Sequence, residues 1–269
     1  MIARVPTFFA LVTVSLLLIG PNAAPAMADP ISLRMEFDGL AGLRVLTLRS
    51  LLDETGNRYT ITVDYATSGV AGVFVDVKTH AQVRGVLGTA TARPETFRNE
   101  TRNNGRERQT RVDYRADGAV DGSSTPPLPE PIPANATRGT VDNLTAYFLL
   151  ERQLARNASC ALAVPVFDGS HRYDVHFTDA GQSTLTPSGG QRFEGNTIAC
   201  RMQRRMLAPA SGSEAEQGAR SGTIWYARLI PTADSMVPVR MTMETQIGSV
   251  DGYLAEIHGR GIDLTLMSK

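Results

Sequence analysis

The sequence predicts a mainly β protein, in which a curled antiparallel sheet, shaped as a half-barrel or spiral, has one helix packed in its concave face. Three observations predict this fold. Most of the chain alternates apolar and polar side chains with a period of two, which is typical of strands with one buried and one solvated face. Glycine-containing pairs separate many of these segments and suit tight hairpins. One stretch near the middle of the chain instead repeats its apolar residues with helical spacing.

Residues 1–28 are expected to be a cleavable secretory signal and not part of the fold. Arg4 gives a positive start, residues 8–19 are apolar but too few to span a bilayer comfortably, and residues 26–28 read Ala-Met-Ala, the small-residue pattern that signal peptidase recognises. An uncleaved membrane anchor is the alternative. The mature chain would be a single periplasmic β domain of residues 29–269, in which no stretch is long and apolar enough to form a transmembrane segment.

The composition limits which classes of protein and of binding partner are plausible. The chain of 269 residues carries 27 Lys and Arg against 27 Asp and Glu, so its formal net charge is zero. Nucleic-acid binding is driven largely by neutralising phosphate charge, and this balance gives no basis for it. Hydrophobic residues make up 42% of the chain, which is enough for a globular core and excludes a disordered or fibrous protein.

Three segments show the alternation most clearly. Each has one apolar face, and polar residues occupy the positions between. The apolar faces consist of Tyr59, Ile61, Val63 and Tyr65; of His171, Tyr173, Val175 and Phe177; and of Val237, Val239, Met241 and Met243. Such patterns fit antiparallel sheet better than parallel sheet, which is buried on both faces.

Four residue pairs are predicted to be hairpin turns because their residue types tolerate positive φ. They are Gly56-Asn57, Asn104-Gly105, Asp168-Gly169 and Asp251-Gly252. A chain of hairpins produces a meander, a barrel or a curled sheet.

Two segments interrupt the alternation. Residues 117–139 contain five prolines and are interpreted as an exposed, partly extended linker that joins two halves of one sheet, with a boundary between two domains as the alternative. A helix is predicted at about residues 141–157, with Thr140 or Asp142 as its N-cap. Its apolar stripe consists of Leu144, Tyr147, Phe148, Leu150 and Leu154.

Cys160 and Cys200 are the only cysteines of the sequence. An even number of cysteines in an exported protein predicts a disulfide. A redox pair or a pair of metal ligands is the alternative, but the sequence has no Cys-x-x-Cys motif and its histidines are scattered. We therefore expect a structural Cys160–Cys200 bridge.

No catalytic residues, metal site or cofactor are expected, and the protein is predicted not to be an enzyme. The sequence lacks a Gly-x-Ser-x-Gly elbow, a phosphate-binding glycine loop and a His-Glu-x-x-His motif. His171 and His176 lie on opposite faces of a predicted strand. The alternative is a periplasmic hydrolase acting on envelope material, which would need a Ser or a carboxylate within hydrogen-bond reach of His171, His176 or His258.

The inner face of a curled sheet with a helix across it is a candidate ligand cavity. Its candidate lining residues are Tyr59, Ile61, Tyr65, Phe148, Tyr173, Phe177, Ile224 and Tyr226. A fully packed core is the alternative. Trp225 alternates out of phase with its two neighbours and is therefore expected on the opposite face.

A set of motifs resembles a known family. The first group runs from residues 142–150 through Cys160 to Val-Pro-Val-Phe-Asp-Gly at 164–169 and Arg-Tyr-Asp at 172–174. The second comprises Cys200, Ile-Trp-Tyr-Ala at 224–227, Asp234, Val-Pro-Val-Arg at 237–240, Gly248 and Leu254, and the N-terminal half matches more loosely through Gly85, Gly88 and Pro94. These residues resemble the exported proteobacterial family called domain of unknown function 3108.

The resemblance implies a curled antiparallel sheet with a helix in its concavity, similar in outline to periplasmic lipoprotein carriers and envelope-integrity proteins, and it implies no enzyme activity. It assigns no role to the motif residues Asp168, Gly169, Arg172, Trp225 and Arg240. We interpret Asp168 as the first residue of an Asp-Gly turn, with an acid or a partner for Arg172 or Arg240 as the alternative.

The sequence therefore leads to a functional hypothesis. It describes a non-catalytic periplasmic envelope protein, with a role in envelope integrity, that binds an apolar lipid-like or peptide-like ligand, or a periplasmic partner protein, through its concave surface. A third interpretation is an assembly module that uses the arginine-rich residues 93–115 or the proline-rich linker.

Overall fold

The computed structural model describes residues 29–39, 42–69, 72, 75–208, 220–231, 233–245 and 248–267. The expected signal peptide at residues 1–28 lies outside the described residues. All strands of the described chain join one 14-stranded sheet, and all strand pairs are antiparallel. The sheet is curled and does not close into a barrel, which confirms the predicted fold class.

The sheet consists of two meanders. The first contains β1 (Ile31–Asp38), β2 (Arg44–Thr55), β3 (Arg58–Thr67), β4 (Val77–Leu87), β5 (Ala92–Asn103), β6 (Arg106–Tyr114) and β7 (Val120–Thr125). The second contains β8 (Leu162–Phe167), β9 (Arg172–Leu185), β10 (Gly195–Ala208), β11 (Ser221–Ala227), β12 (Val237–Thr245) and β13 (Gly248–Gly259), while β14 (Ile262–Thr265) also pairs with β13. The meanders join where β1 pairs with β13, so β7 and β8 are the two ends of the strand order.

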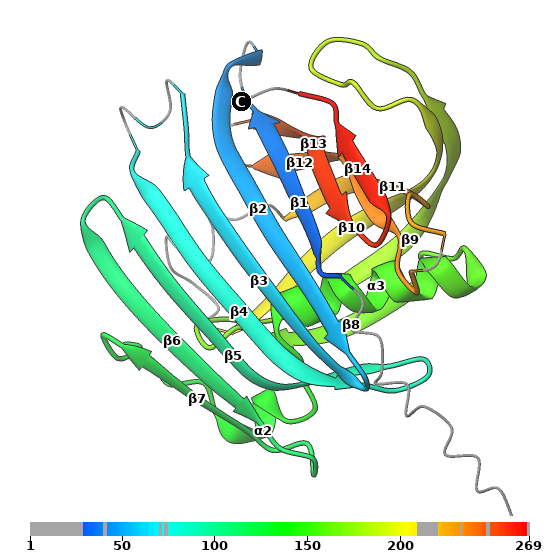
Figure 1. Ribbon diagram of the computed structural model, residues 1–269. Helices are drawn as coiled ribbons and strands as arrows, with labels where there is room; N and C mark the ends of the chain where they lie inside the picture. Colours follow the sequence, from blue (N-terminus) through cyan, green and yellow to red (C-terminus); the bar gives the residue numbers. More distant parts are fainter. Residues whose placement is uncertain are drawn as a thin grey trace, which may run out of the picture.

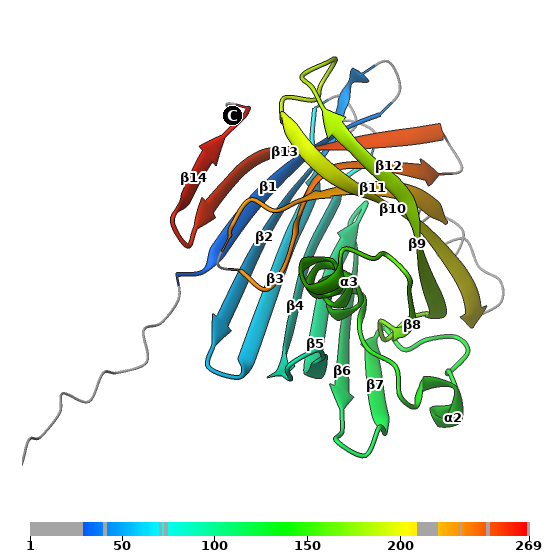
Figure 2. The same cartoon turned by 90° about the vertical axis from the view of Figure 1, so that its right-hand side faces the viewer.

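The helix α3 (Asn143–Asn157) lies inside the curl, between the two meanders (Figure 1). Figure 2 shows α3 nearly end-on, with the first meander on one side and β8–β10 on the other. Its buried side chains divide between the two walls. Ala146, Leu150 and Leu154 belong to a core cluster with β8–β11, whereas Phe148 belongs to a cluster with β3–β6. The helix is therefore the shared core of both meanders.

Local hydrogen bonds fix where α3 begins and ends. The carboxylate of Asp142 accepts hydrogen bonds from the Thr145 backbone N–H at 2.9 Å and from the Thr145 hydroxyl at 2.6 Å, as an N-cap does. The Thr145 hydroxyl also lies 2.8 Å from the Tyr59 hydroxyl on β3, so the cap is tied to the sheet. Burial raises the pKa of Asp142 to about 6, although the bonds from Thr145 oppose this shift. At the other end, Ala158 adopts a left-handed conformation.

A buried ion cluster lies at the junction of the two meanders. The Arg34 guanidinium on β1 donates hydrogen bonds to Glu36, to Glu256 of β13 at 2.7 Å and to the Met267 carbonyl at 2.6 Å. Arg34 and Glu36 alternate with the inward apolar residues of β1 and therefore lie on the outer face. Their hydrogen bonds satisfy charges that are costly to bury alone.

The disulfide expected from the sequence is present and joins Cys160 to Cys200, with a Cα–Cα distance of 5.5 Å. Cys160 precedes β8 and Cys200 lies within β10, so the bridge spans the intervening strand β9. Both cysteines are fully buried in the cluster that packs against α3.

One of the four predicted hairpin turns is wrong. Three pairs do lie at hairpin turns, but Asp251-Gly252 lies inside β13, where Gly252 pairs with Phe37 and Met241. A Cβ added to Gly252 would lie 2.4 Å from the Phe37 ring. The glycine makes room for an aromatic ring of the neighbouring strand and forms no turn.

The proline-rich residues 117–139 are more ordered than an extended linker. They contain β7, which pairs with β6, and the short helix α2 (Ala134–Thr137). The segment leads from the β7 edge of the sheet to α3 and, through it, to the β8 edge. It therefore connects the two meanders across the open side of the curl (Figure 2).

The two ends of the sheet touch at the turn between β8 and β9 without pairing as strands. The Tyr114 hydroxyl of β6 donates a 2.7 Å hydrogen bond to the Phe167 carbonyl. Gly169 has φ +85°, and a Cβ there would lie 2.0 Å from the Thr110 methyl carbon on β6. A larger residue at either position of this contact would push the ends of the sheet apart.

We predict that Gly169→Ala lowers the free energy of unfolding by about 2–5 kcal/mol, because it combines a strained positive φ with a steric clash. Gly105→Ala is the matched control, since Gly105 has φ +79° but no atom within 4 Å of an added Cβ. Urea unfolding should show the smaller loss for Gly105→Ala. Thr110→Ser should relieve most of the excess loss in a double variant. Equal losses for the two glycine variants would contradict the contact.

Candidate functional site

An open pocket of about 380 Å³ lies on the concave face beside the first turns of α3. Residues of both meanders and of the helix form its walls. Its lining residues are Leu46, Leu48, Tyr65, Asn143, Ala146, Tyr147, Val166, Tyr173, Val175, Met202, Arg204 and Met243. The volume falls within the range of roughly 300–1,000 Å³ that is usual for small-molecule sites.

The pocket lining is apolar apart from four neutral polar side chains and one cation. It contains three tyrosines, one asparagine and the guanidinium of Arg204, and it contains no carboxylate. The central guanidinium carbon of Arg204 lies 5.1 Å from the ring centroid of Tyr173, within the range of a cation–π contact. The tyrosine hydroxyls and the asparagine amide can both donate and accept hydrogen bonds, whereas the guanidinium only donates and supplies the one charge of the lining.

The period of β10 explains how an arginine reaches the concave face. Inward positions of this strand carry Met202, Arg204 and Met206, and Met206 pairs with Tyr173 of β9. Arg205, at the next position, is exposed on the opposite face. Arg204 is thus a charge in a row that is otherwise apolar.

The structure brings two of the eight candidate cavity residues to the pocket. Tyr65 and Tyr173 line it. The other six pack into the core against α3 or the sheet, at most 9% exposed: Tyr59, Ile61, Phe148, Phe177, Ile224 and Tyr226. Tyr59 and Phe148 have ring centroids 5.2 Å apart, and Phe177 lies 5.6 Å from Tyr147. The concavity is therefore filled along most of α3 and open near its start.

Sequence reasoning missed most of the lining, including Arg204. The signal that could have found it is the alternation Met-x-Arg-x-Met at residues 202–206, which places the arginine on the apolar face. Leu46 and Leu48 alternate in the same way on β2.

The motif residues around the β8–β9 turn have structural contacts. The Asp168 carboxylate accepts hydrogen bonds from the backbone N–H groups of Ser170 at 2.9 Å and His171 at 2.7 Å, so it caps its own turn. Arg172 donates to the Ala136 carbonyl of α2 at 2.9 Å and to Asp174 at 2.7 Å. The motif therefore holds the turn and α2 in place.

Trp225 and Arg240 are cross-strand neighbours on the outer face, opposite the pocket. The guanidinium carbon of Arg240 lies 4.7 Å from the Trp225 ring, a stacking distance. Arg240 also pairs with Tyr253 of β13. These residues pack the outside of the sheet and do not reach the concave face.

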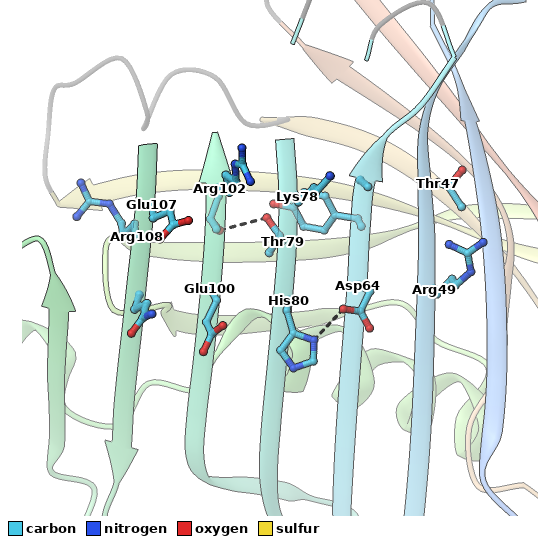
Figure 3. Close-up of a pocket in the computed structure, with 14 residues that line it drawn as sticks. Thr47, Arg49, Asp64, Lys78, Thr79, His80, Glu100, Arg102, Glu107 and Arg108 are labelled. Atoms are coloured by element: carbon cyan, nitrogen blue, oxygen red, sulfur yellow. Dashed lines mark hydrogen bonds and ion pairs between the residues drawn. The ribbon is translucent and has the colours of Figure 1, made fainter. Parts of the chain in front are cut away.

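A second depression, of about 410 Å³, crosses the outer face of β2–β6 (Figure 3). Its side chains carry mixed charges, and several are paired across the strands. His80 Nδ1 lies 2.7 Å from Asp64, whereas the hydroxyls of Thr79 and Thr101, which lie 3.1 Å apart, are on the opposite face by register. Acidic and basic residues line it together, including Glu100, Glu107, Lys78 and Arg102. Charged side chains of both signs therefore distinguish this depression from the concave pocket, whose lining carries one charge.

Histidine–carboxylate pairs occur in the described part of the chain, but outside the concave pocket. His258 Nδ1 lies 2.5 Å from Asp263, its cross-strand neighbour on β14, and both side chains are exposed. His171 Nδ1 lies 3.6 Å from the turn residue Asp168. Within the described ranges, no serine hydroxyl is hydrogen-bonded to a histidine. No cluster of three or more His, Cys, Asp or Glu side chains there could hold a metal ion.

A buried charge cluster closes the end of the curl near the C-terminal half of α3. Glu54 of β2 lies 3.3 Å from Arg152 of α3 and 2.7 Å from Arg260, which follows β13. Arg152 also stacks on Phe148, with its guanidinium carbon 5.6 Å from the ring. Next to this cluster, burial and the charge of Glu54 raise the pKa of Glu151 from 4.5 to about 8.

Fold and pocket together define a curled-sheet protein with a helix-lined inner site. The sequence matches the family model described as Protein of unknown function (DUF3108) over residues 34–255, and the chain belongs to that family. No protein with a curated description matches it. No described helix combines the length and hydropathy needed to span a membrane.

The chain is similar to two solved structures at low sequence identity. A β-barrel-like protein of domain of unknown function DUF1849 from Brucella abortus has a TM-score of 0.52 at 13% identity, covering 88% of this chain and 100% of that one. A putative lipoprotein from Parabacteroides distasonis has a TM-score of 0.38 at 12% identity, covering 87% of this chain and 96% of that one. The first likeness supports the curled-sheet architecture alone.

We predict that Glu151→Gln makes stability less dependent on pH. Because the folded-state pKa of Glu151 is raised from 4.5 to about 8, its contribution is fully favourable below pH 4.5 and is lost as pH rises towards 8. Near pH 8 the variant should be more stable than the wild type by about 1–3 kcal/mol, with little difference near pH 4.5. Urea unfolding across this window, with the exposed Glu130→Gln as control, measures the effect. A constant difference at all pH values would contradict it.

Proposed function

We propose that this protein is a non-catalytic, exported envelope protein that holds an apolar, lipid-like ligand in its concave pocket. The observation that carries the proposal is the pocket itself, whose apolar walls come from both meanders and from α3. Burying the hydrocarbon of a ligand there stabilises the complex by roughly 25 cal/mol per Å² of apolar surface removed from water.

Occupation of the curl by α3 favours a small ligand over a partner protein or a long peptide. The helix packs against both walls, and its side chains fill the concavity along most of its length. Space of about 380 Å³ remains beside Asn143, Ala146 and Tyr147. A lipid-like molecule matches that space better than an added strand or a folded domain.

Export to the periplasm is part of the proposal. Its support comes from the signal-like pattern of residues 1–28 and from the buried Cys160–Cys200 disulfide, because disulfides persist in oxidising compartments such as the periplasm. A lipid-like ligand held in that compartment is consistent with a role in envelope integrity.

The test is binding of Nile red, a neutral apolar fluorophore, to the mature chain and to two variants of β2. Leu48 lines the pocket, and Leu48→Trp should weaken Nile red binding by about ten-fold or more because the larger side chain fills the site. Leu51 lies on the outer face of the same strand and is 44% exposed. Leu51→Trp is therefore the matched control and should bind within about two-fold of the wild type.

Circular dichroism melts establish that both variants are folded. A folded Leu48→Trp variant that binds Nile red as tightly as the wild type would contradict binding in the concave pocket. Failure of the wild-type chain to bind Nile red at all would contradict the proposed function.

A further inference from the structure

Arg204 is an unusual residue for its position. It lies on the inward face of β10 between two methionines, half-buried in the wall of an otherwise apolar pocket. Among the described residues no carboxylate forms an ion pair with its guanidinium, and its contact there is the cation–π stacking on Tyr173. A partly desolvated cation without a counter-charge is energetically unfavourable, so the site is electrostatically complementary to an anion.

Other groups around Arg204 are hydrogen-bond donors. Tyr147 and Tyr173 line the same pocket, and burial raises the pKa of both hydroxyls, so they remain protonated and able to donate. In the part of the chain that the structure describes, neither hydroxyl has a hydrogen-bond partner. The charge of Arg204 opposes the rise in both pKa values.

We infer that the ligand of the concave pocket is an anionic amphiphile, whose carboxylate or phosphate group binds at Arg204 while its hydrocarbon chain lies against the apolar walls. This inference rests on the proposed function and adds the chemical class of the ligand. The guanidinium matches either oxyanion, because its N–H groups can donate to two oxygens at once. Leu46, Leu48, Val175 and Met202 supply the apolar surface for the chain.

Charge complementarity also selects against neutral lipids. A neutral amphiphile would bury its tail equally well, but it would leave the Arg204 guanidinium partly desolvated and without a counter-charge. The inferred specificity therefore depends on a difference between two ligands with the same tail. That difference can be measured apart from the apolar contribution, which is common to both.

The experiment compares dodecanoate, dodecyl phosphate and 1-dodecanol as competitors of bound Nile red, with inorganic phosphate as an arm without a tail. The wild-type chain should prefer the two anionic amphiphiles over 1-dodecanol by about ten-fold or more, as expected for a charge-assisted hydrogen bond. Inorganic phosphate should displace no Nile red at the same concentrations. Arg204→Gln should abolish the preference by weakening the binding of the two anionic amphiphiles relative to that of 1-dodecanol.

Arg205→Gln is the matched control, because Arg205 is the next residue of β10 and is exposed on the opposite face. This variant should keep the preference. Equal binding of dodecanoate and 1-dodecanol by the wild type would overturn the head-group inference and leave the proposed function standing. An equal loss of affinity for all three amphiphiles in Arg204→Gln would also overturn the inference, since the arginine would then act only as part of the wall. If no amphiphile competes and Nile red does not bind, the proposed function itself fails.

Discussion

Packing of α3 against the inner face of a single curled sheet is the interaction on which the rest of the structure depends. The two ends of the sheet, β7 and β8, do not pair with each other, so backbone hydrogen bonds alone do not hold the curl closed. The helix supplies a common apolar surface for both meanders through Phe148 on one side and Leu150 and Leu154 on the other. Burial of this surface draws the two walls together.

Several local features maintain that packing. The N-cap Asp142 and its link through Thr145 to Tyr59 set where the helix starts relative to β3. The disulfide ties the residues after the helix to β10. The turn at Gly169 brings the β8 edge against β6, where a side chain would not fit. The motif residues Asp168, Gly169 and Arg172 thus hold the β8–β9 turn against the first meander and α2.

The pocket and the core share the helix α3. Phe148, Leu150 and Leu154 pack into the core against the two meanders, whereas Asn143, Ala146 and Tyr147 near the start of the helix line the pocket. Arg204 also lines this pocket and gives it a positive charge. The helix therefore contributes side chains both to the core and to the pocket lining.

The sequence predicts the strands, the helix and the disulfide because each has a local or compositional signal. Tyr59, Ile61 and Val63 alternate as expected and are buried, and Asp142 is the N-cap. The pairing of β1 with β13 and the role of Gly252 depend on contacts between distant segments, which no local pattern reveals. For the site, the sequence predicts eight large aromatic and isoleucine side chains as cavity lining. Large side chains also fill space, and only Tyr65 and Tyr173 of the eight reach the pocket.

The central claim is that the curled sheet and α3 leave a site that an anionic amphiphile occupies. Native mass spectrometry of the protein purified from the cells that naturally produce it tests this claim most directly. The account predicts a fraction of the protein carrying one additional acidic, lipid-like molecule that organic solvent releases. The mass of the polypeptide alone, under conditions in which added dodecanoate stays bound, would contradict it.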